Sequence, residues 1–405
     1  MIKPNNTCFT PHWFKYIDTT KQANYKLFEA SYFKSFINHK PFNSKIKLAY
    51  FLDGIFYPTT TGMAYHVMNL LTALTSSGID TYLFRCYRGW EKPEVYKTFK
   101  FNTICIDPVA YYGDLDRVSD LLGENGVNVV VLDTSEVVLL QGSYFKSRLK
   151  LKLIQDVPNV DPLISREVGL KSSIVKRQEQ EILNAEQYVD IYWTKTATDT
   201  EELVKLGVPA RKIKTCGVGV EVGRFTFRKR EKLVPTIKAL YLGNMYYPPN
   251  AGGLKILEKT YLKSNRDRVV LTIDVVGDGD IPVLSRSYPH LRFIGKQEDL
   301  ASLLDKYDLA FACPAYGSGI SLKILDYLAS GIPTISNRVG IRGHSDEILN
   351  AVLVDNNEDF SDSVSRLIRD DKLCWQLSTE GRHYVEKYFD INKKVGSFLK
   401  KSKLI

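Results

Sequence analysis

Gly317-Ser-Gly-Ile-Ser-Leu-Lys-Ile-Leu-Asp-Tyr-Leu-Ala-Ser-Gly-Ile-Pro333 is the stretch that decides the fold of this chain. Its small residues predict a turn, and the apolar spacing over 322–328 predicts a helix directly after it. Gly331 and Pro333 predict the end of that helix. The apolar residues 308–314, just upstream, predict a buried strand. The stretch therefore predicts a short loop that joins a buried strand to a helix N-terminus.

Such a loop presents free backbone N–H groups and the positive end of a helix dipole, a geometry that binds phosphate. Lys323 adds a positive side chain on the first turn of the helix, and Asp326 adds a carboxylate on the next. The combination suits a ligand with a diphosphate and a hydroxylated group. From this stretch alone, an ordinary packing turn of an α/β protein is an open alternative.

At 405 residues the chain is too long to fold around one compact core, so its length predicts two domains. No apolar run reaches the ~18–20 residues that a membrane-spanning helix requires, and we expect no signal peptide. The six cysteines, at positions 8, 86, 105, 216, 313 and 374, have no paired spacing. They predict reduced, buried thiols and a cytoplasmic protein. No Cys-x-x-Cys pair or histidine cluster supports a metal site.

The formal net charge of +9 favours an anionic partner, such as a nucleotide, a phosphorylated lipid or a membrane surface. Charge that serves only solubility is an equally good interpretation. The basic clusters at 228–230 and 393–403 are typical of solvated chain segments. We do not expect nucleic acid as a partner, because no motif combines aromatic with basic residues.

Residues 1–44 are rich in aromatic residues and predict two short helices that pack on the main body or on a partner. From residue 46 onward, strand and helix patterns alternate, and a charged connector at 223–236 separates two such sets. Loops at the predicted carboxyl ends of strands cover 53–62, 155–159, 243–250, 277–279, 295–297 and 315–321. Parallel α/β sheets bind ligands at this edge, so the convergence of these loops predicts a binding site.

Four motifs in sequence order then carry a resemblance: Tyr241-Leu-Gly-Asn-Met-Tyr-Tyr-Pro-Pro-Asn250, Val275-Val-Gly-Asp-Gly279, Phe293-Ile-Gly295 and the stretch 317–333. From about residue 46 to its end, the chain resembles the GT-B glycosyltransferases of family 4, also called glycosyl transferase group 1. The resemblance implies an α/β fold of the GT-B type, with two Rossmann-like domains that face each other across a cleft.

The resemblance also implies a domain organisation. An aromatic-rich extension covers 1–44, an N-terminal acceptor domain 45–225, and a C-terminal nucleotide-sugar (donor) domain 226–385. The last segment, 386–405, is expected to be a helix that returns to the N-terminal domain. We further expect residues 1–44 to form part of an acceptor, membrane or subunit surface, with a simple structural cap as the alternative.

Several site residues follow from the family's motifs. The donor-binding residues implied are Gly62, Asn244, Gly295, Gly319, Ile320, Ser321 and Asp326, of which Asp326 would hold the ribose. The catalytic residues implied are Lys323, Asp156 and His66. For His66, an ordinary helix residue is the alternative interpretation.

The chain departs from the family at three places. Ser318 stands where the family has a glutamate that recognises the donor sugar. The family's Arg and Lys pair is absent; Asn244 stands near the arginine position, and Lys323 is the expected replacement cation. Gln155, next to Asp156, replaces the family's histidine.

The resemblance implies a hexosyltransferase that moves a sugar, with retention and without a metal or other cofactor, from a nucleotide-diphosphate sugar to a saccharide, lipid-linked or protein acceptor. The alternative is a catalytically silent GT-B subunit that scaffolds a partner, which the replacements at Ser318 and Gln155 would suit. A GT-B epimerase would need acidic and histidine catalysts that the sequence does not offer. A peripheral contact with the inner membrane face and a homo-oligomer stay open.

Overall fold

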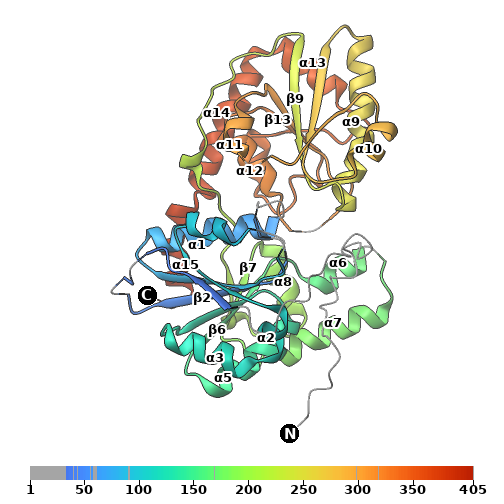
Figure 1. Ribbon diagram of the computed structural model, residues 1–405. Helices are drawn as coiled ribbons and strands as arrows, with labels where there is room; N and C mark the ends of the chain where they lie inside the picture. Colours follow the sequence, from blue (N-terminus) through green and yellow to red (C-terminus); the bar gives the residue numbers. More distant parts are fainter. Residues whose placement is uncertain are drawn as a thin grey trace. The chain divides into compact units, whose positions relative to one another are not determined.

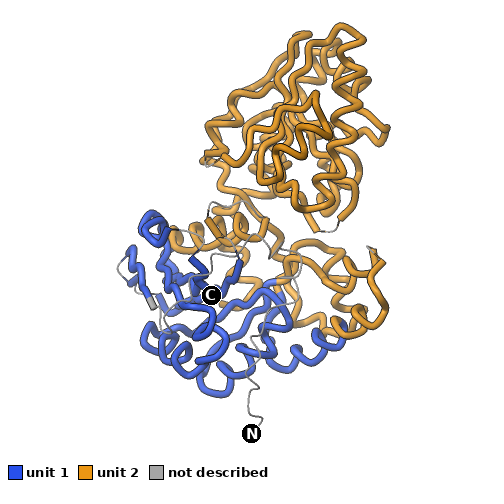
Figure 2. Tube along the Cα trace, turned by 45° about the vertical axis from the view of Figure 1, so that its right-hand side comes forward, with its two compact units in different colours: residues 1–54, 78–156, 179–192 blue, residues 55–77, 157–178, 193–405 orange. Residues whose placement is uncertain are grey.

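The structure is a computed structural model that describes residues 33–39, 41–42, 44–54, 56–57, 62–89, 92–167, 169–297, 299–317 and 319–404. The described residues form two compact units, which Figure 2 shows in different colours. Unit 1 takes its residues from 1–54, 78–156 and 179–192, and unit 2 from 55–77, 157–178 and 193–405. The domain boundaries expected from the sequence stay a prediction.

Strands and helices alternate along the chain, as the sequence predicts (Figure 1). The strands of the first sheet are β1 (Phe33–Phe36), β2 (Lys47–Leu52), β3 (Asp80–Cys86), β4 (Asn102–Ile106), β5 (Val129–Leu132), β6 (Lys152–Val157), β7 (Ile191–Thr194) and β8 (Ile213–Thr215). Those of the second sheet are β9 (Thr236–Leu242), β10 (Val270–Val276), β11 (Arg292–Gly295), β12 (Leu309–Ala312), β13 (Thr334–Ser336) and β14 (Leu353–Val354).

The α-helices are α1 (Gly62–Ser76), α2 (Pro108–Gly113), α3 (Leu115–Glu124), α4 (Ser135–Val137), α5 (Ser143–Arg148), α6 (Asp161–Glu167), α7 (Ser172–Ala185), α8 (Ala197–Lys205), α9 (Pro248–Arg266), α10 (Ile281–Ser287), α11 (Leu300–Leu304), α12 (Leu322–Ala329), α13 (Ser361–Arg369), α14 (Asp371–Tyr388) and α15 (Ile391–Lys401). The buried strand and the helix predicted around the loop at 317–321 are present as β12 and α12. No helix in the described part of the chain is both long and apolar enough to span a bilayer.

The first sheet has the strand order β1-β4-β3-β2-β5-β6-β7-β8. Its strand β2 pairs in parallel with β3 and with β5, and five of its six residues are buried. Strands buried on both faces read as continuous apolar runs, which is how residues 46–52 appear in the sequence. The cysteines of the described residues are all buried, as the sequence predicts.

Strand β1 corrects the prediction of two helices for residues 1–44. Residues 33–36 form a strand that pairs antiparallel with β4, and Phe36 is buried against Tyr96. The physical reason is that the edge of β4 offers unpaired backbone groups, which a neighbouring segment satisfies by adding a strand. The rest of the predicted helical segment, residues 1–32, lies outside the described residues.

The second sheet, in the order β11-β10-β9-β12-β13-β14, is parallel throughout its pairings. Alternate residues of β9 face its two sides: Leu240 and Leu242 join a core with α12 and α14, whereas Tyr241 joins a core with α9 and α13. Figure 1 shows α12 and α9 on opposite sides of β9. This alternation is the two-residue period of a strand that is covered by helices on both faces.

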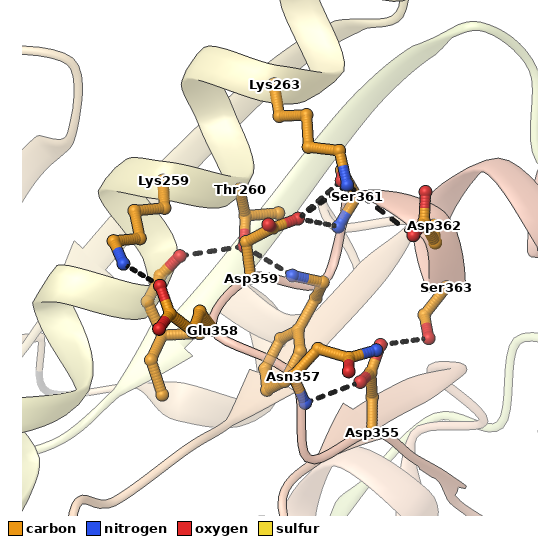
Figure 3. A network of polar contacts seen from close by, with 12 residues as sticks. Lys259, Thr260, Lys263, Asp355, Asn357, Glu358, Asp359, Ser361, Asp362 and Ser363 are labelled. Carbon is orange, nitrogen blue, oxygen red and sulfur yellow. Dashed lines mark hydrogen bonds and ion pairs between the residues drawn. The ribbon is translucent and has the colours of Figure 1, made fainter.

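A polar network joins α9 to the segment that leads into α13, as Figure 3 shows. Thr260 Oγ1 on α9 accepts a hydrogen bond of 2.9 Å from the backbone N–H of Phe360, and Asp359 Oδ1 accepts one of 3.0 Å from the N–H of Ser361. These bonds satisfy backbone donors at the start of α13 that the helix itself leaves unpaired. The network therefore fixes where α13 begins relative to α9.

The carboxyl ends of β9 and β10 come unusually close to each other. Gly277 has a φ of 143°, and a Cβ atom at this position would lie 1.8 Å from the carbonyl oxygen of Gly243. Only glycine fits there. The loops that follow β9 and β10 are therefore held side by side at one edge of the sheet.

The end of the chain packs on α1, both within unit 2. Helix α15 contacts α1. The ring of Phe398 on α15 lies 4.3 Å from that of Trp193, whose Nε1 donates a hydrogen bond of 2.6 Å to Ser402. The C-terminal helix thus supports the helix that begins at Gly62.

Candidate functional site

Unit 2 contains a cavity of about 590 Å³ at the carboxyl edge of the second sheet. Loops that follow β9, β10, β11 and β12 supply most of its lining, as expected for a parallel α/β sheet. The start of α1, residues 158–159, Lys195, Val218 and Val339 complete the wall. All of these residues belong to unit 2.

Three helices begin at this cavity: α1 at Gly62, α9 at Pro248 and α12 at Leu322. The N-termini of α1 and α12 lie close together, since a methyl group at Gly62 would lie 3.6 Å from the Leu322 side chain. Ser321 precedes α12 but its side chain makes no capping hydrogen bond. The first N–H groups of α12 therefore face the cavity region without a side-chain cap, which suits an anion.

The predicted loop residues Gly319, Ile320 and Ser321 all line the cavity. Gly319 has a φ of 73°, and a methyl group there would lie 2.9 Å from Asn159 Oδ1. Both the backbone conformation and the close approach of Asn159 require a residue without a side chain.

Lys323 also lines the cavity, and two neutral groups hold its ammonium. Its Nζ donates a hydrogen bond of 2.8 Å to Asn250 Oδ1 and lies 4.7 Å from the centre of the Tyr241 ring. Asn250 is fixed in turn, because its Nδ2 donates to the carbonyl of Asn244 at 3.1 Å. Burial lowers the pKa of Lys323 to about 8. Within the described part of the chain, Lys323 forms no ion pair with a carboxylate.

Asp326 is buried at the cavity wall and accepts a hydrogen bond of 2.7 Å from the Tyr65 hydroxyl at Oδ1. Burial raises the pKa of Asp326 to about 7, although the hydrogen bond from Tyr65 opposes this shift. Desolvation disfavours the charged form of a carboxyl group. The carboxyl of Asp326 therefore changes its protonation state near neutral pH.

His66 lies beside Lys195, another buried residue of the cavity wall, with 2.9 Å between His66 Nε2 and Lys195 Nζ. Because an ammonium has only donors, His66 Nε2 serves as the acceptor when Lys195 is charged. That arrangement engages the lone pair that a general base would need at Nε2. It favours a positioning role for His66 over proton abstraction through this atom.

The other predicted residues have different surroundings. Asn244 lines the cavity; Gly295 does not, whereas its neighbours Lys296 and Gln297 do. Asp156, fully buried in unit 1, accepts a hydrogen bond of 2.7 Å from the Tyr50 hydroxyl. Ser318 lies outside the described residues.

Sequence reasoning missed the partners of the predicted residues: Asn250, Tyr241, Tyr65 and Lys195. Asn250 and Tyr241 belong to the quoted motif 241–250, but no local spacing links them to Lys323. Lys195 directly follows β7, and its position at the carboxyl end of a strand could have predicted that it lines the site. No group of His, Cys, Asp or Glu side chains large enough to hold a metal was found among the residues that the structure describes.

Comparisons with known proteins agree with this geometry. Residues 236–370 match the family model of the glycosyl transferases group 1. No curated protein matches the chain. Among solved structures, HepE of Anabaena in complex with UDP and glucose is similar with a TM-score of 0.70 and 10% identity, over 89% of this chain and 100% of that one.

Two further structures show the same likeness. Sucrose-phosphate synthase of Thermosynechococcus elongatus has a TM-score of 0.67 and 14% identity, over 88% of this chain and 99% of that one. WaaG, a glycosyltransferase involved in lipopolysaccharide biosynthesis, has a TM-score of 0.61 and 15% identity, over 88% and 99%.

The protein thus has the fold of the GT-B glycosyltransferases, with two parallel-sheet domains, as the sequence predicts. Its residues 236–370, which carry the second sheet and the cavity's main loops, are the part that matches the glycosyl transferases group 1 model.

Proposed function

We propose that the protein is a glycosyltransferase that uses a nucleotide-diphosphate sugar, retains the anomeric configuration and needs no metal ion. The observation that carries the proposal is the Lys323 ammonium, which lies at the cavity wall between an amide and an aromatic ring, one residue inside the N-terminus of α12. A cation with neutral partners only is suited to a ligand that brings its own negative charge.

The diphosphate would bind at the N-terminus of α12, where backbone N–H groups and Lys323 converge. Cleavage of the bond between sugar and phosphate adds negative charge to the leaving diphosphate, and donors fixed in advance stabilise that charge. A lysine and helix N-termini can supply this stabilisation, so the proposal involves no divalent ion. The leaving diphosphate itself would accept the proton of the acceptor hydroxyl, and the sugar would be attacked on the face that the nucleotide leaves.

The nucleoside would be held beside the diphosphate. Asp326 is proposed to accept hydrogen bonds from the ribose hydroxyls, with Tyr65 holding one carboxyl oxygen. Lys296 and Gln297, at the cavity wall after β11, would border the base. Because HepE was solved with UDP and glucose, a uridine nucleotide is the first candidate for the donor.

A thermal-shift screen against nucleoside diphosphates and their glucose, galactose and N-acetylglucosamine derivatives tests the proposal. We expect one nucleotide series to raise the melting temperature and to be hydrolysed slowly without an acceptor, with or without EDTA. Binding without hydrolysis or transfer, for every sugar, would instead favour the silent subunit. No binding of any nucleotide would contradict the glycosyltransferase, whereas a silent subunit does not require a nucleotide.

Lys323→Met provides the decisive variant, because methionine keeps the length of the side chain and removes its charge. We expect turnover to fall by about 100-fold or more, the effect of removing one preorganised donor to a developing negative charge. Lys306→Met, at an exposed lysine outside the cavity, is the matched control and should retain wild-type turnover. Unchanged turnover in a folded Lys323→Met variant would contradict the role of Lys323.

The proposal includes a cytoplasmic location for the enzyme. It leaves open whether the enzyme contacts the inner membrane face and whether it self-associates. The acceptor also stays open at this level, as a saccharide, a lipid-linked sugar or a protein.

A further inference from the structure

Lys195 is another lysine at the wall of the cavity, and it is buried together with His66. The two residues are 6% and 3% exposed, and 2.9 Å separate Lys195 Nζ from His66 Nε2. An ammonium carries three N–H donors, and the bond to His66 uses one of them. Burial of a charged group costs free energy, which a ligand of opposite charge in the cavity would offset. The position of Lys195 therefore suits an anionic group of a ligand.

The side chain of Lys195 is held at both ends. Its backbone lies between β7 and Thr196, the N-cap residue of α8. Thr196 and Asp199 form a capping box, in which each side chain accepts a hydrogen bond of 3.0 Å from the backbone N–H of the other residue. This reciprocal pair fixes the first turn of the helix. At the other end of the side chain, His66 Nε2 fixes the position of the ammonium.

A second buried ammonium lies near Lys195. Lys394 Nζ donates a hydrogen bond of 2.9 Å to the carbonyl of Val218, which also lines the cavity. Burial lowers the pKa of Lys394 to about 8, and the charges of Lys401 and Lys195 contribute to this decrease. The carboxylate in this neighbourhood is that of Asp199, which the backbone and the hydroxyl of Thr196 engage. Because neighbouring ammonium groups repel each other, an anion bound beside them is stabilised.

The segment that carries Lys195 packs beside the loop assigned to the diphosphate, within unit 2. A Cβ atom at Gly343 would lie 2.9 Å from the carbonyl oxygen of Gly319 and 2.9 Å from Thr196 Cγ2. Gly343 follows β13, whereas the Lys323 ammonium lies over a ring of β9, and β12 is the strand between β9 and β13. The segment of Lys195 therefore reaches the loop after β12 from the side opposite to Lys323.

We propose that Lys195 is a phosphate-binding residue of the cavity and that His66 positions its ammonium. This inference rests on the proposed function and adds a second cation to the site. The phosphate can belong to the diphosphate of the donor or to a phosphorylated acceptor. Both present the same charged oxygens to a lysine, with which they form strong, charge-assisted hydrogen bonds. The experiment separates these two sources.

The test measures the affinities of uridine, UDP and glucose 6-phosphate by calorimetry, the last with and without saturating UDP. If another nucleotide series proves to bind, its nucleoside and diphosphate replace the uridine probes. Lys195→Met removes the charge and keeps the length of the side chain. Lys205→Met, at an exposed lysine of α8 outside the cavity, is the matched control. The melting temperature shows that each variant is folded.

We expect Lys195→Met to weaken the binding of a phosphorylated probe about 10- to 100-fold, the scale of one hydrogen bond to a charged group. Uridine, which has no phosphate, should bind to the variant and to the wild type equally. Loss confined to UDP assigns Lys195 to the donor diphosphate, and loss confined to glucose 6-phosphate assigns it to a phosphorylated acceptor. Loss for both probes places Lys195 between the two groups. If the wild type binds no glucose 6-phosphate, the UDP measurement alone decides.

The positioning role of His66 has a test of its own. His66→Phe removes the acceptor at Nε2 and should weaken binding of the same probe about 3- to 10-fold, the scale of one ordinary hydrogen bond. In a Lys195→Met background, His66→Phe should have no further effect, because it acts through the ammonium. His66→Gln, which offers an amide acceptor, should retain more affinity than His66→Phe. Additive effects of the two substitutions would contradict the positioning role.

Two results would overturn the assignment of Lys195: a folded Lys195→Met variant that binds UDP and glucose 6-phosphate like the wild type, or a uridine affinity that falls as much as the UDP affinity. The second result would mean a general change of the cavity. Failure of the proposed function gives a different pattern, since the wild type would then bind no nucleotide. The measurement with glucose 6-phosphate alone still tests Lys195 in that case, and a wild type that binds neither probe would overturn both proposals.

Discussion

At the scale of single residues, Lys323 and Asp326 share one turn of α12, and burial shifts their pKa values in opposite directions. The lysine is surrounded by neutral groups, and burial lowers its pKa to about 8. The carboxyl is buried beside a tyrosine hydroxyl, and burial raises its pKa to about 7. We therefore expect both groups to titrate near neutral pH, where their effects on the proposed ligand can be measured.

The first prediction concerns the acid side of the pH dependence. Affinity for a nucleotide sugar, whose esterified diphosphate keeps its charge over this range, should rise as the pH passes upward through about 7. The reason is that ionised Asp326 accepts hydrogen bonds more strongly than the protonated carboxyl. Asp326→Asn should weaken binding by ~1–3 kcal/mol above pH 8. It should also abolish the rise in affinity around pH 7, here called the acid limb of the pH profile. Calorimetry between pH 5.5 and 9 checks both, and an unaltered acid limb in the variant would assign it to another group.

The second prediction concerns Asn250, which we expect to position the Lys323 ammonium. Affinity should fall as the pH rises through about 8, because Lys323 then loses its charge. In Asn250→Asp, the new carboxylate favours the charged lysine, so this alkaline limb should move to higher pH. Affinity at pH 7 should fall, since the carboxylate competes with the diphosphate.

Asn250→Leu is the companion variant, and its alkaline limb should not move upward. ¹³C-methylation of lysines, followed by NMR titration, reads the Lys323 pKa directly without any ligand. If the pKa is equal in wild type and Asn250→Asp, Asn250 does not hold the lysine.

At the scale of secondary-structure elements, the prediction from sequence succeeded where one local pattern decides the structure. Helix α12 has its apolar spacing and its stop signals within 317–333, so its position follows from that stretch alone. Strand β1 has no such pattern: its four residues become a strand because β4 presents a free edge 66 or more positions later. Pairing with a distant segment is a tertiary effect that overrides local propensity.

The third prediction tests that pairing at Phe36. Its side chain is 4% exposed and lies 5.5 Å from the ring of Tyr96. Phe36→Ala should destabilise unit 1 by about 3 kcal/mol, the usual cost of removing a buried aromatic ring. The neighbouring Ile37, 58% exposed, offers the control Ile37→Ala, which should change the free energy of unfolding little. Urea denaturation compares the two, and equal effects would argue against β1 as a packed strand.

At the scale of the whole molecule, the cavity draws on segments far apart in the sequence. The hydrogen bond from Tyr65 to Asp326 joins residues 261 positions apart, and Lys323 meets Asn250 across 73. Sequence motifs could name Lys323 and Asp326, because their spacing on one helix is local. They could not name Tyr65, Lys195 or Asn250 as partners, because only the folded chain brings these side chains to one wall.

The last prediction concerns the support of that wall by the end of the chain. Phe398 on α15 is 3% exposed and packs at 4.3 Å on Trp193, and α15 contacts α1, which begins at the cavity. Phe398→Ala should lower the stability of unit 2 by about 3 kcal/mol, because it leaves a void beside a buried indole. It should also weaken the proposed nucleotide-sugar binding, since Gly62 and Tyr65 of α1 line the cavity.

Lys400→Ala, an exposed position on the same helix, is the matched control and should leave both quantities unchanged. Melting temperature and calorimetric affinity are measured on each variant. If Phe398→Ala lowers the melting temperature but binds the nucleotide sugar like the wild type, α15 stabilises unit 2 without shaping the cavity. The contact between α15 and α1 would then have no part in substrate binding.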